Sequence, residues 1–349
     1  MESNEKNLEG LFRFLTDAGA GIMGSPLGVP TALHFGDPVA EHHAARTGPA
    51  VIDLSHLGSI RVGGGDRAAF LHRMVTSDVS AMMPGESRPS AFLTTKGKFV
   101  AVFDLICEED SFVIVTPRED LDPLLADLTK YAILDDVAFT DESVARASIH
   151  LSGIEDVRQE DMPDHVLVRK NRTGEPGCDL HMPADRVVSF WKSLVEADTT
   201  PVGHMAHETL RIEAGIPRAG AELTGDIGPL EAGMPELVSL TKGCYRGQEV
   251  VAKMHYIGKP PKRIVGLGID DADEDAPEDA AGALPAPGDP IMSDGKNVGR
   301  VTSAAYGPTL GRRVALGLVR ARAIEEGAPV TCETARGILV MRFEETPFR

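Results

Sequence analysis

The chain has 349 residues, enough for two or three domains with separate cores. Its 53 acidic and 35 basic residues give a formal net charge of -18. Phosphate contacts dominate affinity for nucleic acid, so this charge argues against nucleic acid as a partner. The chain has no apolar run of about 18 residues, and we therefore expect no membrane span.

The cysteines and the N-terminus predict a cytoplasmic protein. The cysteines are scattered with no C-x-x-C pair, which indicates neither a disulfide framework nor a zinc site. Residues 1–6 are polar and acidic, unlike a secretory signal or a transit peptide. A reducing compartment fits both observations.

Up to about residue 150, predicted strand pairs alternate with helices. Apolar spacing predicts helices at 8–17, 41–46, 67–76 and 121–131. Alternating patterns and apolar runs predict strands at 51–52, 59–62, 91–95, 99–107, 112–116, 137–140 and 147–151. These elements follow no regular βαβ rhythm, so the predicted fold class is α+β rather than a doubly wound sheet.

The second half of the chain predicts two more helices and then a small β domain. The helices are expected at 187–197, with Trp191 in the core, and at 207–214. The stretch 266–290 is predicted to be a linker or long loop, because most of it is acidic and rich in Ala and Pro. Four short strands then predict a β-barrel-like domain over 291–349.

The nine-residue loop from Thr241 to Glu249 contains a lysine, a cysteine, a tyrosine, an arginine and a Gln-Glu pair. Cys244 lies between Lys242 and Arg246, and nearby cations favour the reactive thiolate. Six basic residues and one acid lie between positions 242 and 263, which predicts an anionic ligand on this otherwise acidic chain. The alternative is that these cations only solvate a strand and a loop.

This loop closely resembles the K-G-C-Y-x-G-Q-E signature of the YgfZ-type folate-binding proteins. These are relatives of the glycine-cleavage T-protein, an aminomethyltransferase, and are implicated in the assembly or repair of iron–sulfur enzymes. The segments 41–46, 51–56 and 209–215 also resemble T-protein patterns. The resemblance implies two related α+β folate-binding domains over 1–265, interleaved with a boundary near 145–150. It also implies that these and the C-terminal β-barrel domain form a three-leaf ring around tetrahydrofolate.

The resemblance also implies site residues. Asp104 matches the strand acid beside the folate nitrogen that receives the one-carbon unit, where a carboxylate would stabilise positive charge. Asp179 matches the acid that grips the pterin in T-G-E-x-G-x-E-I. His207 stands where the T-protein has a folate-contacting arginine, and Thr116 where it has an asparagine. Lys242 and Arg246 are expected to contact the folate, with Cys244 as the key thiol near the mouth of the channel.

The sequence also contains an Arg–Glu pair and three histidines whose roles could be structural or functional. Arg211 and Glu213 form either a buried structural pair or ligand contacts. His42, His43 and His56 are not accompanied by acids or cysteines at metal-ligand spacing, so we expect no metal site.

Three hypotheses follow for the function. The first is a tetrahydrofolate-binding protein of the YgfZ type that supports iron–sulfur cluster assembly or repair, with iron–sulfur enzymes or assembly proteins as partners. The second is a folate-dependent aminomethyltransferase or demethylase, which the departures at His207 and Thr116 weaken. The third is a non-catalytic scaffold that kept the fold and lost the ligand.

Overall fold

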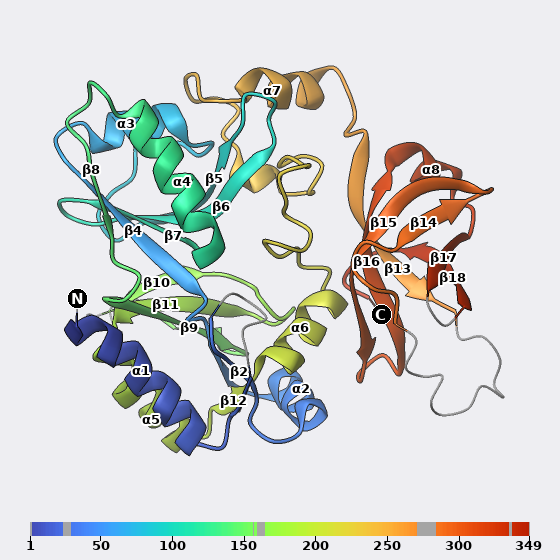
Figure 1. The fold of residues 1–349 in the computed structure, drawn as a ribbon, viewed down its shortest axis with the longest axis horizontal. Helices are drawn as coiled ribbons and strands as arrows, with labels where there is room; N and C mark the ends of the chain where they lie inside the picture. The colour runs from blue at the N-terminus through green and yellow to red at the C-terminus, as the bar shows by residue number, and fades with distance from the viewer. Residues whose placement is uncertain are drawn as a thin grey trace.

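The computed structural model describes residues 2–23, 29–155, 157–158, 165–270, 284–334 and 337–348. Two α+β units and a β-barrel are arranged around helix α6 (His204–Glu213) and the segment that follows it (Figure 1). The predicted α+β class, with two such units and a C-terminal barrel, is confirmed. Among the described residues, no helix is long and apolar enough to cross a membrane.

The first unit is a five-stranded sheet covered on one face by two helices. Its strand order is β5 (Ser87–Leu93), β6 (Phe99–Cys107), β7 (Phe112–Pro117), β4 (Leu57–Gly63) and β8 (Ala138–Asp141). Helices α3 (Arg67–Met74) and α4 (Arg118–Tyr131) share a core with this sheet. Side chains alternate along a strand, so Phe103 and Leu105 of β6 join that core while Asp104 points to the other face.

The second unit takes strands from both sides of the first unit in sequence. Its strand order is β10 (Val166–Arg169), β11 (Gly177–Pro183), β9 (Arg146–Ser152), β3 (Ala50–Asp53) and β12 (Thr200–Val202). Helices α1 (Glu2–Asp17) and α5 (Val187–Glu196) share a core with it, and Trp191 is fully buried there as expected. Beside this sheet lie helix α2 (Pro38–Thr47) and the strand pair β1 (Gly21–Met23) and β2 (Thr31–His34).

The barrel corrects the predicted domain limits. Six strands close in the order β13 (Lys262–Ile269), β16 (Arg312–Arg320), β15 (Lys296–Gly307), β14 (Pro290–Ser293), β17 (Val330–Thr334) and β18 (Gly337–Glu344), and helix α8 (Ala321–Glu326) follows β16. The barrel therefore begins at Lys262 rather than at 291, and residues 266–269 are strand rather than linker. Strand β13 pairs with both β16 and β18 and so closes the barrel. The two glycines of β13 interrupt the apolar pattern by which a strand is predicted from sequence. Residues 271–283 of the predicted linker lie outside the described residues.

The loop with the K-G-C-Y signature packs against the first unit. It follows a short 3₁₀ turn, η2 (Pro235–Leu237), and leads into helix α7 (Gln248–Tyr256). Helix α7 lies at the top of the molecule in Figure 1, next to the β5–β6 hairpin. Its residue Val251 packs in a core cluster with Leu93 and Phe99 of that hairpin.

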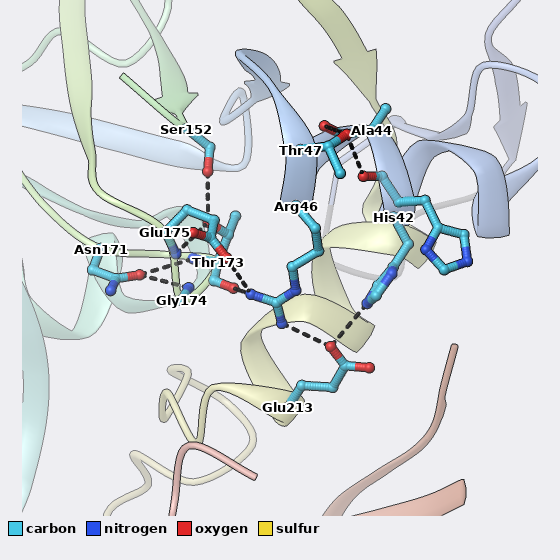
Figure 2. A network of polar contacts seen from close by, with 11 residues as sticks. His42, Ala44, Arg46, Thr47, Ser152, Asn171, Thr173, Gly174, Glu175 and Glu213 are labelled. Carbon is cyan, nitrogen blue, oxygen red and sulfur yellow. Dashed lines mark hydrogen bonds and ion pairs between the residues drawn. The ribbon is translucent and has the colours of Figure 1, made fainter. Parts of the chain in front are cut away.

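A buried polar network fixes α2, α6 and the turn at 171–175 relative to one another (Figure 2). The Glu213 carboxylate on α6 accepts hydrogen bonds from His42 Nε2 at 2.9 Å and from Arg46 Nη2 at 2.7 Å. Arg46 Nη1 donates to the Thr173 carbonyl at 3.0 Å and to the Glu175 carboxylate at 2.8 Å. Glu213 therefore has structural partners, although its partners are His42 and Arg46 rather than Arg211.

The two carboxylates bonded to Arg46 provide a matched test of this network. Glu213 is 3% exposed and Glu175 is 30% exposed. Removing a buried partner leaves charged and polar groups unpaired, so we expect Glu213→Ala to lower the free energy of unfolding by about 2–4 kcal/mol. We expect about 0–1 kcal/mol for Glu175→Ala. Urea denaturation followed by the fluorescence of Trp191 measures both, and equal losses would contradict this account.

Candidate functional site

A cavity of about 960 Å³ lies where the three units meet. Its volume falls within the range of about 300–1,000 Å³ that is usual for small-molecule pockets. Strand β6, the end of β10 with its following turn, helix α6 and strand β13 all contribute to its wall. Apolar residues alternate there with a few charged groups, so the cavity suits a flat ligand with apolar faces and polar edges.

Asp104, which the family resemblance implied as a site residue, projects from β6 into this cavity. The residue is 3% exposed, and its Oδ2 accepts a hydrogen bond from Lys170 Nζ at 2.5 Å. Lys170 follows β10, so the ion pair connects the two α+β units across the cavity. The lysine holds the carboxylate in one orientation beside the space that a ligand would occupy.

Asp179 lies behind the cavity wall, which differs from the prediction that it grips a ligand. It is fully buried on β11 and is absent from the cavity lining. Its carboxylate accepts hydrogen bonds from Arg172 at 2.6–3.0 Å and pairs with His150 Nδ1 at 2.9 Å. Burial alone would raise the pKa of Asp179, but Arg172 and His150 hold it well below the usual value. Arg172, rather than Asp179, reaches the cavity.

Helix α6 turns one face toward the cavity. His204, His207, Glu208 and Arg211 recur at helical spacing and all line it. Burial lowers the pKa of His207 well below its ordinary value and lowers that of His204 too. His56, from the start of the first unit, also lines the cavity, and burial lowers its pKa to about 3. These rings are therefore neutral near pH 7 and offer both hydrogen-bond donors and acceptors.

Arg211 connects α6 to the barrel. Its Nη2 donates to Glu208 at 2.8 Å and to Ser303 Oγ at 2.6 Å, and its Nη1 donates to Glu222 at 2.8 Å. Glu208 also pairs with Arg218 Nε at 2.9 Å. The structural role left open for Arg211 is thus filled by Glu208 and Glu222, although the side chain also lines the cavity.

The signature loop lies outside the lining of the cavity, and Lys242 and Arg246, which were predicted to contact the folate, bond to the protein instead. Lys242 is 7% exposed, and its Nζ donates to the carbonyls of His72, Val75 and Ser77 at 2.5–2.9 Å. It therefore anchors the loop to the carboxyl end of α3, where backbone carbonyls lack helical partners. Burial lowers the pKa of Lys242 to about 8, so the ammonium stays charged at neutral pH.

Arg246 anchors the same loop to α4. Its Nη1 donates to Asp127 at 2.9 Å, and its guanidinium lies 5.0 Å from the centre of the Phe92 ring and 5.1 Å from that of Tyr131. Cys244 is exposed and lies outside the cavity lining, whereas Cys107, Cys178 and Cys332 are buried. The two cations that flank Cys244 thus bind the protein itself.

Sequence reasoning missed Lys170 and Arg172. The stretch Arg169-Lys170-Asn171-Arg172 stands directly before the T-G-E turn and carries three cations in four residues. That charge pattern was the available signal for cationic groups near the ligand. In the described part of the chain, no group of His, Cys, Asp and Glu residues could hold a metal ion, and His42 pairs with Glu213 instead.

Comparison with known proteins identifies the family. The description "GCVT N-terminal domain" matches residues 23–156 and 154–242, and "Glycine cleavage T-protein C-terminal barrel domain" matches residues 262–348. The chain belongs to the glycine cleavage T-protein family. It is 30% identical to an aminomethyltransferase from Halalkalibacterium halodurans, over 90% of this chain and 91% of that protein.

Further relatives and a solved structure agree with this placement. An aminomethyltransferase from Bacillus subtilis is 29% identical, over 90% of this chain and 92% of that protein. The crystal structure of the glycine cleavage system aminomethyltransferase T from Bartonella henselae superimposes with a TM-score of 0.84. That match covers 97% of each chain at 23% identity, and it shows the T-protein fold.

Glu208 makes the free energy of unfolding depend on pH. Burial would raise its pKa, but Arg211 and Arg218 lower it from 4.5 to about 2. Its ionised form therefore stabilises the fold fully above about pH 4.5, and the contribution is lost as the pH falls toward 2. We expect Glu208→Gln to cost on the order of 2–3 kcal/mol at pH 7, with the difference from wild type shrinking below pH 4.5.

Urea denaturation at pH values from 7 down to 3 measures this difference. Glu249→Gln, at an exposed acid of α7, is the control and should change stability little at any pH. A wild-type advantage over Glu208→Gln that stayed constant across the range would contradict the assignment.

Proposed function

We propose that this chain binds tetrahydrofolate in the central cavity and acts as a folate-dependent transferase of the aminomethyltransferase type. The observation that carries the proposal is Asp104, a nearly buried carboxylate that projects into a cavity of about 960 Å³ in a T-protein fold. The relatives named aminomethyltransferase support the same reaction class. The departures at His207 and Thr116 make turnover the decisive experiment.

The residues of the cavity fit a folate. Apolar side chains such as Val102 and Leu316 can pack against the two faces of a pterin, and charged and polar groups stand at its edges. Tetrahydrofolate would supply a nucleophilic amine that accepts the one-carbon unit. The protein would exclude water, hold the ligand, and place the Asp104 carboxylate where positive charge develops.

Lys170 and Asp104 would act together in this site. The lysine fixes the carboxylate and keeps a cation beside it when the cavity is empty. A positively charged amine or iminium would then meet an already oriented carboxylate, so little reorganisation is needed during the reaction. This arrangement assigns Asp104 to charge stabilisation and Lys170 to positioning.

The first test is an anaerobic calorimetric titration with tetrahydrofolate, followed by turnover. We expect about one tetrahydrofolate per chain. With an S-aminomethyl dithiol as donor, we expect methylenetetrahydrofolate to form as ammonia and thiol are released. Asp104→Asn should lower kcat by about 10²–10³, because it removes the charge aimed at the reacting centre, while the Kd for tetrahydrofolate changes little. Binding without turnover by the wild type would reject the transferase.

A second function rests on the exposed thiol of Cys244. Among the four cysteines it alone is exposed, and it lies outside the cavity in the loop that resembles the YgfZ signature. An exposed thiol can ligate iron or exchange with a partner's thiol. We therefore propose, as the alternative, that the folate-bound protein supports iron–sulfur cluster assembly or repair through Cys244.

Replacing the thiol tests this alternative. We expect Cys244→Ala to leave stability and the Kd for tetrahydrofolate within about two-fold of wild type, because the side chain is on the surface. The same variant should fail to restore the activity of an iron–sulfur enzyme in cells that lack this protein. Thr241→Ala, at an exposed position of the same loop, is the control and should restore it. Full restoration by Cys244→Ala would remove the thiol from the mechanism.

A further inference from the structure

Arg172 presents unused hydrogen-bond donors to the cavity. A guanidinium carries five N–H groups. Its Nε and Nη2 donate to the Asp179 carboxylate at 2.6–3.0 Å. Among the described residues, Nη1 has no hydrogen-bond partner. Because the side chain is 17% exposed and lines the cavity, its free N–H groups border the space available to a ligand.

The turn that carries Arg172 is held firmly in place. Asn171 Oδ1 accepts hydrogen bonds from the backbone N–H groups of Thr173 and Gly174, at 3.2 and 2.7 Å. Thr173 Oγ1 lies 2.6 Å from Ser152 Oγ, and its carbonyl accepts from Arg46. Figure 2 shows these contacts converging on the 171–175 turn. Arg172 is therefore preorganised, which is the condition for selective recognition.

Asp179 is not available to a ligand in this arrangement. It has no exposed surface, and both its carboxylate oxygens bond to Arg172, one of them also to His150. A ligand that reached Asp179 would first have to displace Arg172 and leave a buried guanidinium without its partner. That exchange is costly, because breaking a buried ion pair exposes an uncompensated charge to an apolar surrounding.

The two side chains would recognise opposite parts of a pterin ring. A carboxylate accepts hydrogen bonds from the ring N3–H and the 2-amino group. A guanidinium donates them, and its acceptor on the ring is the oxygen at C4. We propose that Arg172, positioned by Asp179, binds the C4 oxygen of the pterin and so selects 4-oxo over 4-amino folates. This inference rests on the proposed folate binding and names the group that orients the ligand.

A direct comparison of two ligands tests the inference on the unmodified protein. Tetrahydrofolate and tetrahydroaminopterin differ at C4, where an amino group replaces the oxygen, and consequently at N3, which loses its hydrogen in the neutral 4-amino ring. The amino group cannot accept from Arg172, and its ring is more basic, so protonation would place a cation beside the guanidinium. We expect anaerobic calorimetry to show tetrahydrofolate binding at least about ten-fold tighter, as a lost charge-assisted hydrogen bond implies.

The opposite contact predicts the opposite result. If Asp179 bound the ring, the protonated 4-amino ligand would pair well with the carboxylate and bind equally or more tightly. Equal or tighter binding of tetrahydroaminopterin therefore overturns the inference, while the proposed folate site stands. No binding of tetrahydrofolate at all overturns both the inference and the proposed function.

Two variants test whether Arg172 causes the preference for tetrahydrofolate over tetrahydroaminopterin. Arg172→Met combined with Asp179→Asn removes both charges together, so that neither is left buried without its partner. We expect this double variant to bind the two ligands with equal affinity. Arg73→Gln, at a cation of α3 that pairs with Asp135 and lies outside the cavity lining, is the control and should keep the ratio. Discrimination retained by the double variant would assign the selectivity to another residue.

Discussion

Paired guanidinium and carboxylate groups fix helix α6 and the turn at 171–175, which form one side of the cavity. Buried charges are tolerated only when they are paired and hydrogen-bonded, so each pair fixes the elements that carry its members. Arg46 and Glu213 join α2 to α6, Arg172 and Asp179 join the 171–175 turn to β11, and Arg211 with Glu222 joins α6 to the segment before the barrel. The shape of the cavity depends on these pairs being satisfied together.

Electrostatics set the charges of two kinds of groups in the cavity wall and directly behind it. The acids Glu208 and Asp179 are paired with arginines, which keeps them ionised, while burial keeps the rings of His56 and His207 neutral. Near neutral pH none of these groups changes its charge. The ligand space therefore offers a fixed field, and a reaction there would draw on orientation more than on titrating side chains.

The sequence predicted the helices and strands that have a local pattern of apolar residues. It missed the pairings between residues that are distant in sequence. The strand predicted at 99–107 is β6, which carries Phe103 into the core and Asp104 on the opposite face. Strand β13 was misjudged because its role comes from pairing with β16 and β18, which are distant in sequence. The cations of the signature loop looked like ligand contacts because spacing alone cannot show that Lys242 bonds to the end of α3.

Asp179 also shows that a sequence motif does not reveal which group a side chain will contact. A matched motif gives the residue type and its strand, but the partner of its carboxylate depends on position 172, seven residues earlier. With an arginine there, the acid becomes a support for a cation that lines the cavity. His207 stands where the resemblance implies an arginine, and Arg172 brings a guanidinium to the cavity near it from another element. The cavity thus has a guanidinium near His207 that comes from another element.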